Sequence, residues 1–192
     1  MTWLPNQLLL AAAAWPAPMP VLVQAFEQDF VASTPLFQSM EVKHNPRINT
    51  LGGVSETLWH IITHEDCVFN PKTRRKTLER VFDVQRARRL PWCRALIENN
   101  AQPEIQQWEK LEGNGQTRTY IRVPAHNYVV ILQSRIHKAT LQTEWLLITA
   151  FHINHQGKRD DFDREYLAHQ ALSAGIKKAP HDGALALSTR GR

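Results

Sequence analysis

Hydrophobic and polar positions divide the chain into a first half with helical spacing and a second half with the spacing of strands. Helical spacing predicts a helix over about 21–32 and another that starts at Ser55, a suitable N-cap, with Glu56 in its first turn. A basic third helix is predicted over about 73–89, and Pro91 then opens a short fourth one.

Strand-like runs take over after Pro103. Asn114-Gly115 gives a strong hairpin-turn signal between the first two runs, and the last two are apolar enough for the centre of a sheet. A final helix is predicted over about 161–173. The four predicted strands span residues 104–111, 117–123, 127–135 and 144–153.

These elements predict an α+β fold, in which N-terminal helices pack on one face of a four-stranded antiparallel sheet and a C-terminal helix follows. The other face of such a sheet can stay partly open. We expect an apolar, Pro-rich segment at 1–50, the α+β domain itself at 51–175 and a flexible tail at 176–192. No run of residues is long and apolar enough to span a membrane.

The apolar stretch at 8–20 resembles the apolar part of a secretory signal. A signal also needs a positive start, and no Lys or Arg occurs before Lys43. We therefore expect a segment that packs on the domain or on a partner. Two cysteines, Cys67 and Cys93, leave either one disulfide or a reduced pair, and their low number favours a reducing compartment such as the cytoplasm.

Charge is concentrated in one window. The chain carries a net charge of +5, and the window 70–94 holds nine Lys or Arg against two acidic residues. Such a block is typical of a surface that binds a polyanion, and it is equally compatible with a solvated helix face that binds nothing.

Two histidines, His60 and His64, lie four residues apart and would share one face of the predicted helix. The zinc-protease signature needs Glu directly after the first of them, where this chain has Ile61. His152 and His155 are close in sequence, but no carboxylate or cysteine clearly completes a metal site with them. We predict neither a metal nor a cofactor. His152 is a candidate for proton transfer, although a structural role is commoner for a lone histidine.

The strand at 117–123 places Arg118, Tyr120 and Arg122 on one face. Two arginines beside a tyrosine would suit a phosphate and a stacked base, and an ordinary exposed sheet face has the same pattern. Phosphate-binding glycine loops, nucleophile-elbow serines and kinase motifs are all missing from the sequence.

Thr149 lies inside the most apolar predicted strand. Strict alternation would place Trp145, Leu147 and Phe151 on its side and point His152 away. A β-bulge in this strand would remove the conflict.

Residues of these types can cleave RNA without a metal. One group removes the proton from the ribose 2′-hydroxyl, and another protonates the leaving 5′-oxygen. Cations stabilise the charge of the phosphorane-like transition state. Because RNA supplies its own nucleophile, no catalytic serine or cysteine is required.

The order of the elements resembles the BECR fold, the barnase, EndoU, tRNA-cleaving colicin and RelE type of RNase, and is similar in particular to its phage- and toxin-associated branch. The resemblance covers about 55–172 and is carried by "LWHIITHED", "RTYIR", "YVVILQSR" and "LLITAFHI". It implies His64 or His60 as acid or base. Arg118 and Arg122 would be phosphate ligands, with Thr149 as a backbone or phosphate contact. Second-tier candidates are Tyr120, His152, Lys158 and Tyr166.

The resemblance implies a metal-independent endoribonuclease, a toxin or effector that cuts tRNA or another structured RNA. It also implies an antitoxin or immunity protein as partner, and action in the cytoplasm or in a target cell. Arg75, Arg86 and Arg89 of the basic window would bind the RNA. Two alternatives stay open: a non-catalytic nucleic-acid-binding protein, and a phage-type interaction module that docks through its N-terminal segment.

Overall fold

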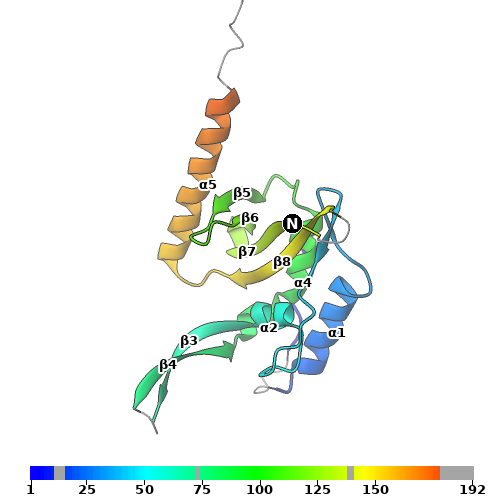
Figure 1. The fold of residues 1–192 in the computed structure, drawn as a ribbon, viewed down its shortest axis with the longest axis vertical. Helices are drawn as coiled ribbons and strands as arrows, with labels where there is room; N and C mark the ends of the chain where they lie inside the picture. Colours follow the sequence, from blue (N-terminus) through cyan, green and yellow to red (C-terminus); the bar gives the residue numbers. More distant parts are fainter. Residues whose placement is uncertain (11–15, 72–73, 138–140, 178–192) are drawn as a thin grey trace, which may run out of the picture.

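The computed structural model describes residues 1–10, 16–71, 74–137 and 141–177 (Figure 1). Within these ranges the helices are α1 (Met19–Phe30), α2 (Glu56–Ile62), α3 (Val84–Arg88), α4 (Leu90–Glu98) and α5 (Gln156–Lys177), with a 3₁₀ helix at Pro124–His126. The strands are β1 (Leu36–Phe37), β2 (Met40–Lys43), β3 (Thr63–Asn70), β4 (Arg75–Phe82), β5 (Gln106–Leu111), β6 (Thr117–Val123), β7 (Tyr128–Ile136) and β8 (Thr143–His152).

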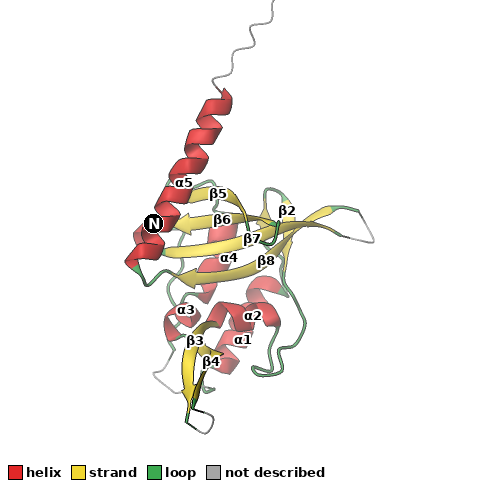
Figure 2. Cartoon of the chain, turned by 60° about the vertical axis from the view of Figure 1, so that its left-hand side comes forward, coloured by secondary structure: helices red, strands yellow, loops and turns green. Residues whose placement is uncertain are grey.

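Six strands form one curled sheet in the order β1-β2-β8-β7-β6-β5 (Figure 2). The α+β class and the antiparallel meander from β5 to β8 are confirmed. The prediction of a purely antiparallel, four-stranded sheet is wrong, because β1 and β2 extend it and β2 runs parallel to β8. Val42 lies opposite Trp145, and Lys43 lies opposite Leu146.

The predicted basic helix over 73–89 is also wrong. Residues 63–70 and 75–82 form the antiparallel pair of β3 and β4, whose register places Thr63 opposite Phe82. Leu78 of β4 is exposed. The two strands satisfy each other's backbone groups, so the hairpin forms without a buried face. It projects away from the body of the protein (Figures 1 and 2).

The helix that starts at Ser55 is shorter than predicted. It ends at Ile62, because Thr63 already has extended backbone, with φ −125° and ψ 160°. Consecutive β-branched residues at this point favour extended chain over a further helical turn. His64 consequently lies on β3, and the prediction that it shares a helix face with His60 is wrong.

The main core lies between one face of the sheet and the helices α1, α2 and α4. Residues from the N-terminal segment are part of it, and they include Leu22, Phe26, Phe30, Phe37 and Val42. Phe37 is fully buried and meets Trp145 of β8 edge to face, with 4.9 Å between ring centroids. The first fifty residues therefore belong to the same packed unit as the meander.

The opposite face of the sheet is covered in part by α5. Trp108 and Tyr120 from β5 and β6 stack on each other, with ring centroids 5.0 Å apart, and Phe162 of α5 packs against both. α5 starts at Gln156, earlier than predicted, and runs to Lys177. The predicted flexible tail lies almost entirely outside the described residues. No helix in the described part of the chain combines the length and apolarity needed to cross a membrane.

β8 contains a β-bulge. Ile131 of β7 pairs with Thr149 and Leu132 pairs with Leu147, so Ile148 is the extra residue. The bulge interrupts the alternation of side chains along β8, and this interruption sets which of them face the core.

Candidate functional site

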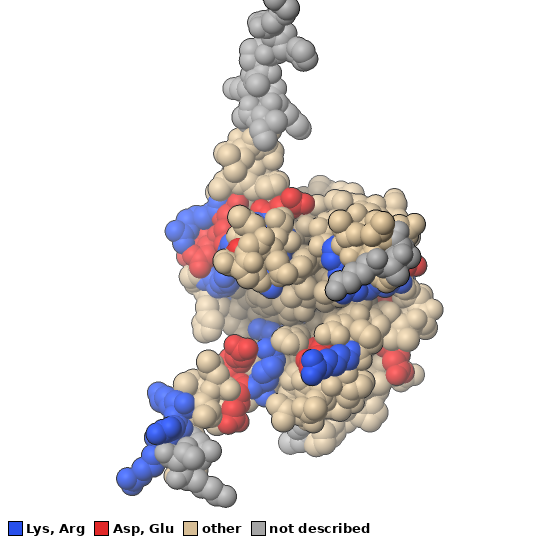
Figure 3. Space-filling view, in the orientation of Figure 1, with Lys and Arg blue, Asp and Glu red and all other residues tan. Residues whose placement is uncertain are grey.

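A cleft of about 900 Å³ lies between the sheet and the unit formed by α2, α3 and the base of the hairpin. Figure 3 shows the hollow between these two parts, with charged side chains along its margins. The cations that line it are Arg47, Arg80, Arg86, Arg118 and Lys158, and the carboxylates are Glu56, Glu65 and Asp83. Its histidines are His60, His64, His152 and His155.

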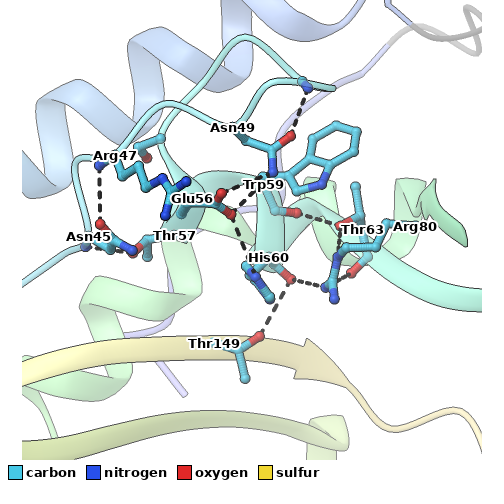
Figure 4. A network of polar contacts seen from close by, with 12 residues as sticks. Asn45, Arg47, Asn49, Glu56, Thr57, Trp59, His60, Thr63, Arg80 and Thr149 are labelled. Carbon is cyan, nitrogen blue, oxygen red and sulfur yellow. Dashed lines mark hydrogen bonds and ion pairs between the residues drawn. The ribbon is translucent and has the colours of Figure 1, made fainter.

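His60 reaches the cleft because of the way α2 is oriented. Ser55 caps the helix by accepting a hydrogen bond from the Leu58 backbone N–H at 3.2 Å. The apolar residues of α2 are buried, whereas His60 is partly exposed and points toward β8 (Figure 4). Burial, and next the positive charge of Arg80, lower the pKa of His60 below the ordinary 6.5. The imidazole is therefore neutral at neutral pH.

The end of α2 is tied to the hairpin through Arg80. Its Nε donates to Thr63 Oγ1 at 3.0 Å, and the same hydroxyl donates to the Trp59 carbonyl at 2.5 Å (Figure 4). Arg80 also donates to the His60 carbonyl at 3.5 Å, and Thr149 Oγ1 approaches this carbonyl at 3.5 Å from β8. These contacts hold the His60 backbone between the hairpin and the sheet.

His64 comes to the same cleft from β3. Its Nδ1 lies 3.2 Å from Asp83 Oδ2, which is within ion-pair distance, although the angle is not that of a hydrogen bond. Asp83 caps α3 by accepting from the backbone N–H groups of Gln85 and Arg86 at 2.9 and 3.1 Å. The carboxylate is thus fixed in place beside one ring nitrogen, and the other ring nitrogen is left for a ligand.

The side chains of Arg118 and Arg86 differ in the contacts that they make with the rest of the protein. Arg86 donates to the Thr63 carbonyl at 2.7 Å and lies over the Phe151 ring, with 5.0 Å between the guanidinium carbon and the ring centroid. Arg118, from β6, makes no hydrogen bond or ion pair with the described residues, and its buried Nε has no partner there. A half-buried guanidinium without a carboxylate is well suited to bind an anionic ligand.

The β-bulge brings Thr149 into the cleft. Trp145 and Leu147, which precede it, are buried in the main core, and Thr149 and Phe151, which follow, line the cleft. The bulge thereby separates Thr149 from Trp145 and Leu147, whereas Phe151 stays on the side of Thr149, as alternation predicts. His152 also borders the cleft, and its Nδ1 lies 2.5 Å from Asn154 Oδ1. Burial is the main cause that lowers the pKa of His152.

Tyr120 and Arg122 lie outside the cleft, beneath α5. Arg122 has 3% of its side chain exposed and pairs with Asp163 of α5 at 2.6 Å. The Tyr120 hydroxyl donates to Glu112, and burial together with this carboxylate raises the pKa of the phenol. The structure therefore separates two residues of the "RTYIR" motif from Arg118, the third.

The predicted RNA contacts are scattered. Arg86 and Lys158 line the cleft, and Lys158 Nζ lies 4.7 Å from the centroid of the Phe162 ring. Arg75 is exposed near the end of the hairpin. Arg89 donates to the Gln85 carbonyl at 2.7 Å and lies over Trp92, away from the cleft.

Sequence reasoning missed Arg47, Arg80 and Asp83. A hairpin signal near Arg80 was present, because Asn70-Pro71 can start a turn. Asp83 stands directly before a short helical run, which is the usual position of an N-cap. Arg47 lies in a loop, and nothing in the sequence connects it with the histidines.

Neither a metal centre nor a disulfide is formed by the described residues. No group of three or more His, Cys, Asp or Glu in those ranges could hold a metal ion. Both cysteines are free, with Cys67 exposed and Cys93 buried. The two cysteines are thus a reduced pair and do not form a disulfide.

Comparisons with family models, with curated proteins and with solved structures found no match to this chain. The functional argument therefore depends on the geometry of the cleft.

Proposed function

We propose that the chain is an endoribonuclease that cleaves RNA through the 2′-hydroxyl, with His60 and His64 as its proton-transfer pair. The observation that carries this proposal is the convergence of both histidines and the unpaired Arg118 on one large cleft. These residues come from three different elements, α2, β3 and β6. A neutral imidazole, a second imidazole and a free cation are the groups that this reaction requires.

His60 acts as the general base. Its lowered pKa keeps the imidazole neutral at neutral pH, so that it can accept the proton of the 2′-hydroxyl. The Thr149 hydroxyl and Arg80 hold the His60 backbone, and this contact positions the ring above β8.

His64 acts as the general acid. The Asp83 carboxylate lies beside Nδ1 and leaves Nε2 to donate a proton. As the 2′-oxygen bonds to phosphorus, the bond between phosphorus and the 5′-oxygen breaks, and the leaving oxygen takes the proton from His64. The products are a 2′,3′-cyclic phosphate and a 5′-hydroxyl, and the base is left protonated for the next proton transfer.

Arg118 stabilises the negative charge that develops on the phosphate oxygens. Its guanidinium has no carboxylate among the described residues to neutralise it, whereas Arg80 pairs with Glu65 at 3.3 Å. Removing one such preorganised donor typically lowers kcat by about 10²- to 10³-fold. Arg118 is therefore the cation whose loss should affect turnover most.

A cleavage assay tests the proposal. Purified protein is incubated with total RNA in excess EDTA, together with His60→Gln, His64→Gln and Arg118→Ala, and with His169→Gln as a control histidine outside the cleft. We expect discrete fragments from the wild type and the control, and none from the other three. Equal cleavage by all variants would refute the assignment, and uncut RNA with the wild type would refute the activity.

A non-catalytic RNA-binding protein is the second candidate, favoured by the basic end of the hairpin (Figure 3). It would bind RNA in the same assay without cutting it. The interaction-module hypothesis has less support, because Leu22, Phe26 and Phe30 of the apolar N-terminal segment that motivated it are buried in the main core. An antitoxin or immunity protein as partner, tRNA as the substrate, and delivery into a target cell stay predictions from the resemblance.

A further inference from the structure

The β3–β4 hairpin presents two different faces. Cross-strand partners share a face, so Glu65 with Arg80, Cys67 with Leu78 and Phe69 with Lys76 form one surface, here called the apolar–basic face. The other face places Asp66 directly opposite Glu79. Two adjacent carboxylates repel a polyanion. The hairpin can therefore bind a polyanion only along the apolar–basic face.

The apolar–basic face continues the cleft. Arg80 and Glu65, at its near end, line the cleft themselves. From Arg80 to Lys76 the strand extends by about 13 Å at the usual rise per residue. Lys76 lies at its far end, and Arg75, next to it on β4, points to the other face. Figure 3 shows Lys and Arg gathered on the projecting hairpin.

The middle of this face is unusually apolar for a projecting arm. Phe69 is 56% exposed and lies directly opposite Lys76, and Leu78 is 75% exposed and lies between Lys76 and Arg80. Scattered exposed apolar residues need no explanation, but these two are diagonal neighbours across one strand pair. An aromatic ring beside a cation is an arrangement in which an unpaired base stacks while a phosphate binds the cation.

We propose that the hairpin binds the unpaired nucleotides that adjoin the scissile phosphate, so that the substrate is RNA with a single-stranded segment at the cleavage site. This proposal rests on the proposed function for the position of the scissile phosphate. A base stacks on Phe69 and Leu78, and Lys76 binds the following phosphate. A duplex does not fit, because its base faces are already stacked inside the helix.

Binding is measured with a fluorescent, unstructured 2′-O-methyl RNA, which lacks the nucleophile and cannot be cut. Phe69→Ala should weaken binding about tenfold, as expected for the loss of one stacked base. Leu172→Ala, at a position of α5 that is 70% exposed, should leave it unchanged. Lys76→Gln should reduce the slope of log K against log salt by about 0.7, and neither Arg75→Gln, on the opposite face of the hairpin, nor Arg164→Gln, on α5, should reduce it.

Cross-linking locates the RNA without any substitution. Cys67 is exposed on the apolar–basic face and Cys93 is buried, so a benzophenone maleimide labels the hairpin selectively. We expect the label to cross-link the unstructured RNA and not the same strand annealed to its complement. No cross-link, an equal yield with the duplex, or wild-type affinity of Phe69→Ala would each overturn the proposal.

A cleavable dinucleotide separates this proposal from the proposed function. It is too short to reach the hairpin, so its turnover should survive in Phe69→Ala and be lost in His64→Gln. If RNA binds to the hairpin but is not cleaved, only the ribonuclease assignment is refuted. If RNA is cleaved and the substitutions in the hairpin do not weaken binding, only the hairpin site is refuted.

Discussion

His64 and Asp83 meet where the hairpin returns to the body of the protein, with 3.2 Å between Nδ1 and Oδ2. The same carboxylate caps α3 and lies 3.5 Å from Arg86 Nε. One side chain thus orients the proposed acid and begins the next helix. Substitutions of Asp83 can separate these two tasks.

Asp83→Asn should lower kcat and leave the fold intact. Asparagine is as good an N-cap as aspartate, but it places no carboxylate beside His64 Nδ1. We expect a loss of activity of at least about tenfold, since a general acid contributes about 10²- to 10⁴-fold. Thermal unfolding and kcat are measured together. Asp83→Ala should also lose about 1 kcal/mol of stability with the cap, and full activity of Asp83→Asn would contradict the role.

The pH dependence of cleavage should report His60. Burial and Arg80 lower its pKa, so the neutral base persists as the pH falls below 6.5 and is lost only at more acidic pH. The acidic limb of kcat/KM should therefore lie below 6.5. Arg80→Gln removes the second cause of the shift and should move this limb to higher pH, whatever it does to the maximal rate. Arg164→Gln, on α5, serves as the control, and an unmoved limb in Arg80→Gln would exclude His60 as the base.

Tyr120 and Arg122 should contribute to stability and not to turnover. Both are covered by α5, and Arg122 is bound to Asp163. Arg122→Ala should cost about 1.5–3 kcal/mol, the range for a hydrogen bond to a charged group. Tyr120→Phe should keep wild-type kcat at a temperature where the variant is folded. A strong loss of kcat in the folded variants would place these residues back in the catalytic machinery.

The N-terminal segment should be indispensable for folding. Phe37→Ala empties a fully buried site beside Trp145, and such substitutions cost about 3–5 kcal/mol. Phe69→Ala, at an exposed position of the hairpin, should change stability by less than about 0.5 kcal/mol. Urea unfolding of both variants checks this, and equal stabilities would mean that β1 is not part of the folded unit.

The meander could be predicted because its signals are local. β6 has the predicted bounds, and Asn114-Gly115 marks its turn. The pairing of β2 with β8 could not be predicted, since two residue pairs join segments about a hundred residues apart. Such a contact leaves no local periodicity, and its partners are selected by the packing of Phe37 and Trp145.

The hairpin and the site show a second limit of sequence patterns. β3 and β4 bury almost nothing, so they lack the apolar alternation that identifies a strand, and basic residues between them resembled a helix face. His60 and His64 were predicted to share a helix face, and this was wrong, since a strand and not a helix carries His64. The sequence indicated that a bulge would be needed in this strand but not that it lies at Ile148, because alternation alone does not show where a strand gains a residue.

The parallel pairing of β2 with β8 has a consequence for the timing of synthesis. His60, His64 and Arg118 are all translated before β8, which forms one wall of the cleft and supports Thr149. A nascent chain that has not reached residue 155 therefore carries the reactive side chains without the cleft that unites them. Under the proposed function, ribosome-bound chains would stay inactive toward the RNA around them, and cleavage would begin only after the sheet closes on its earliest strand.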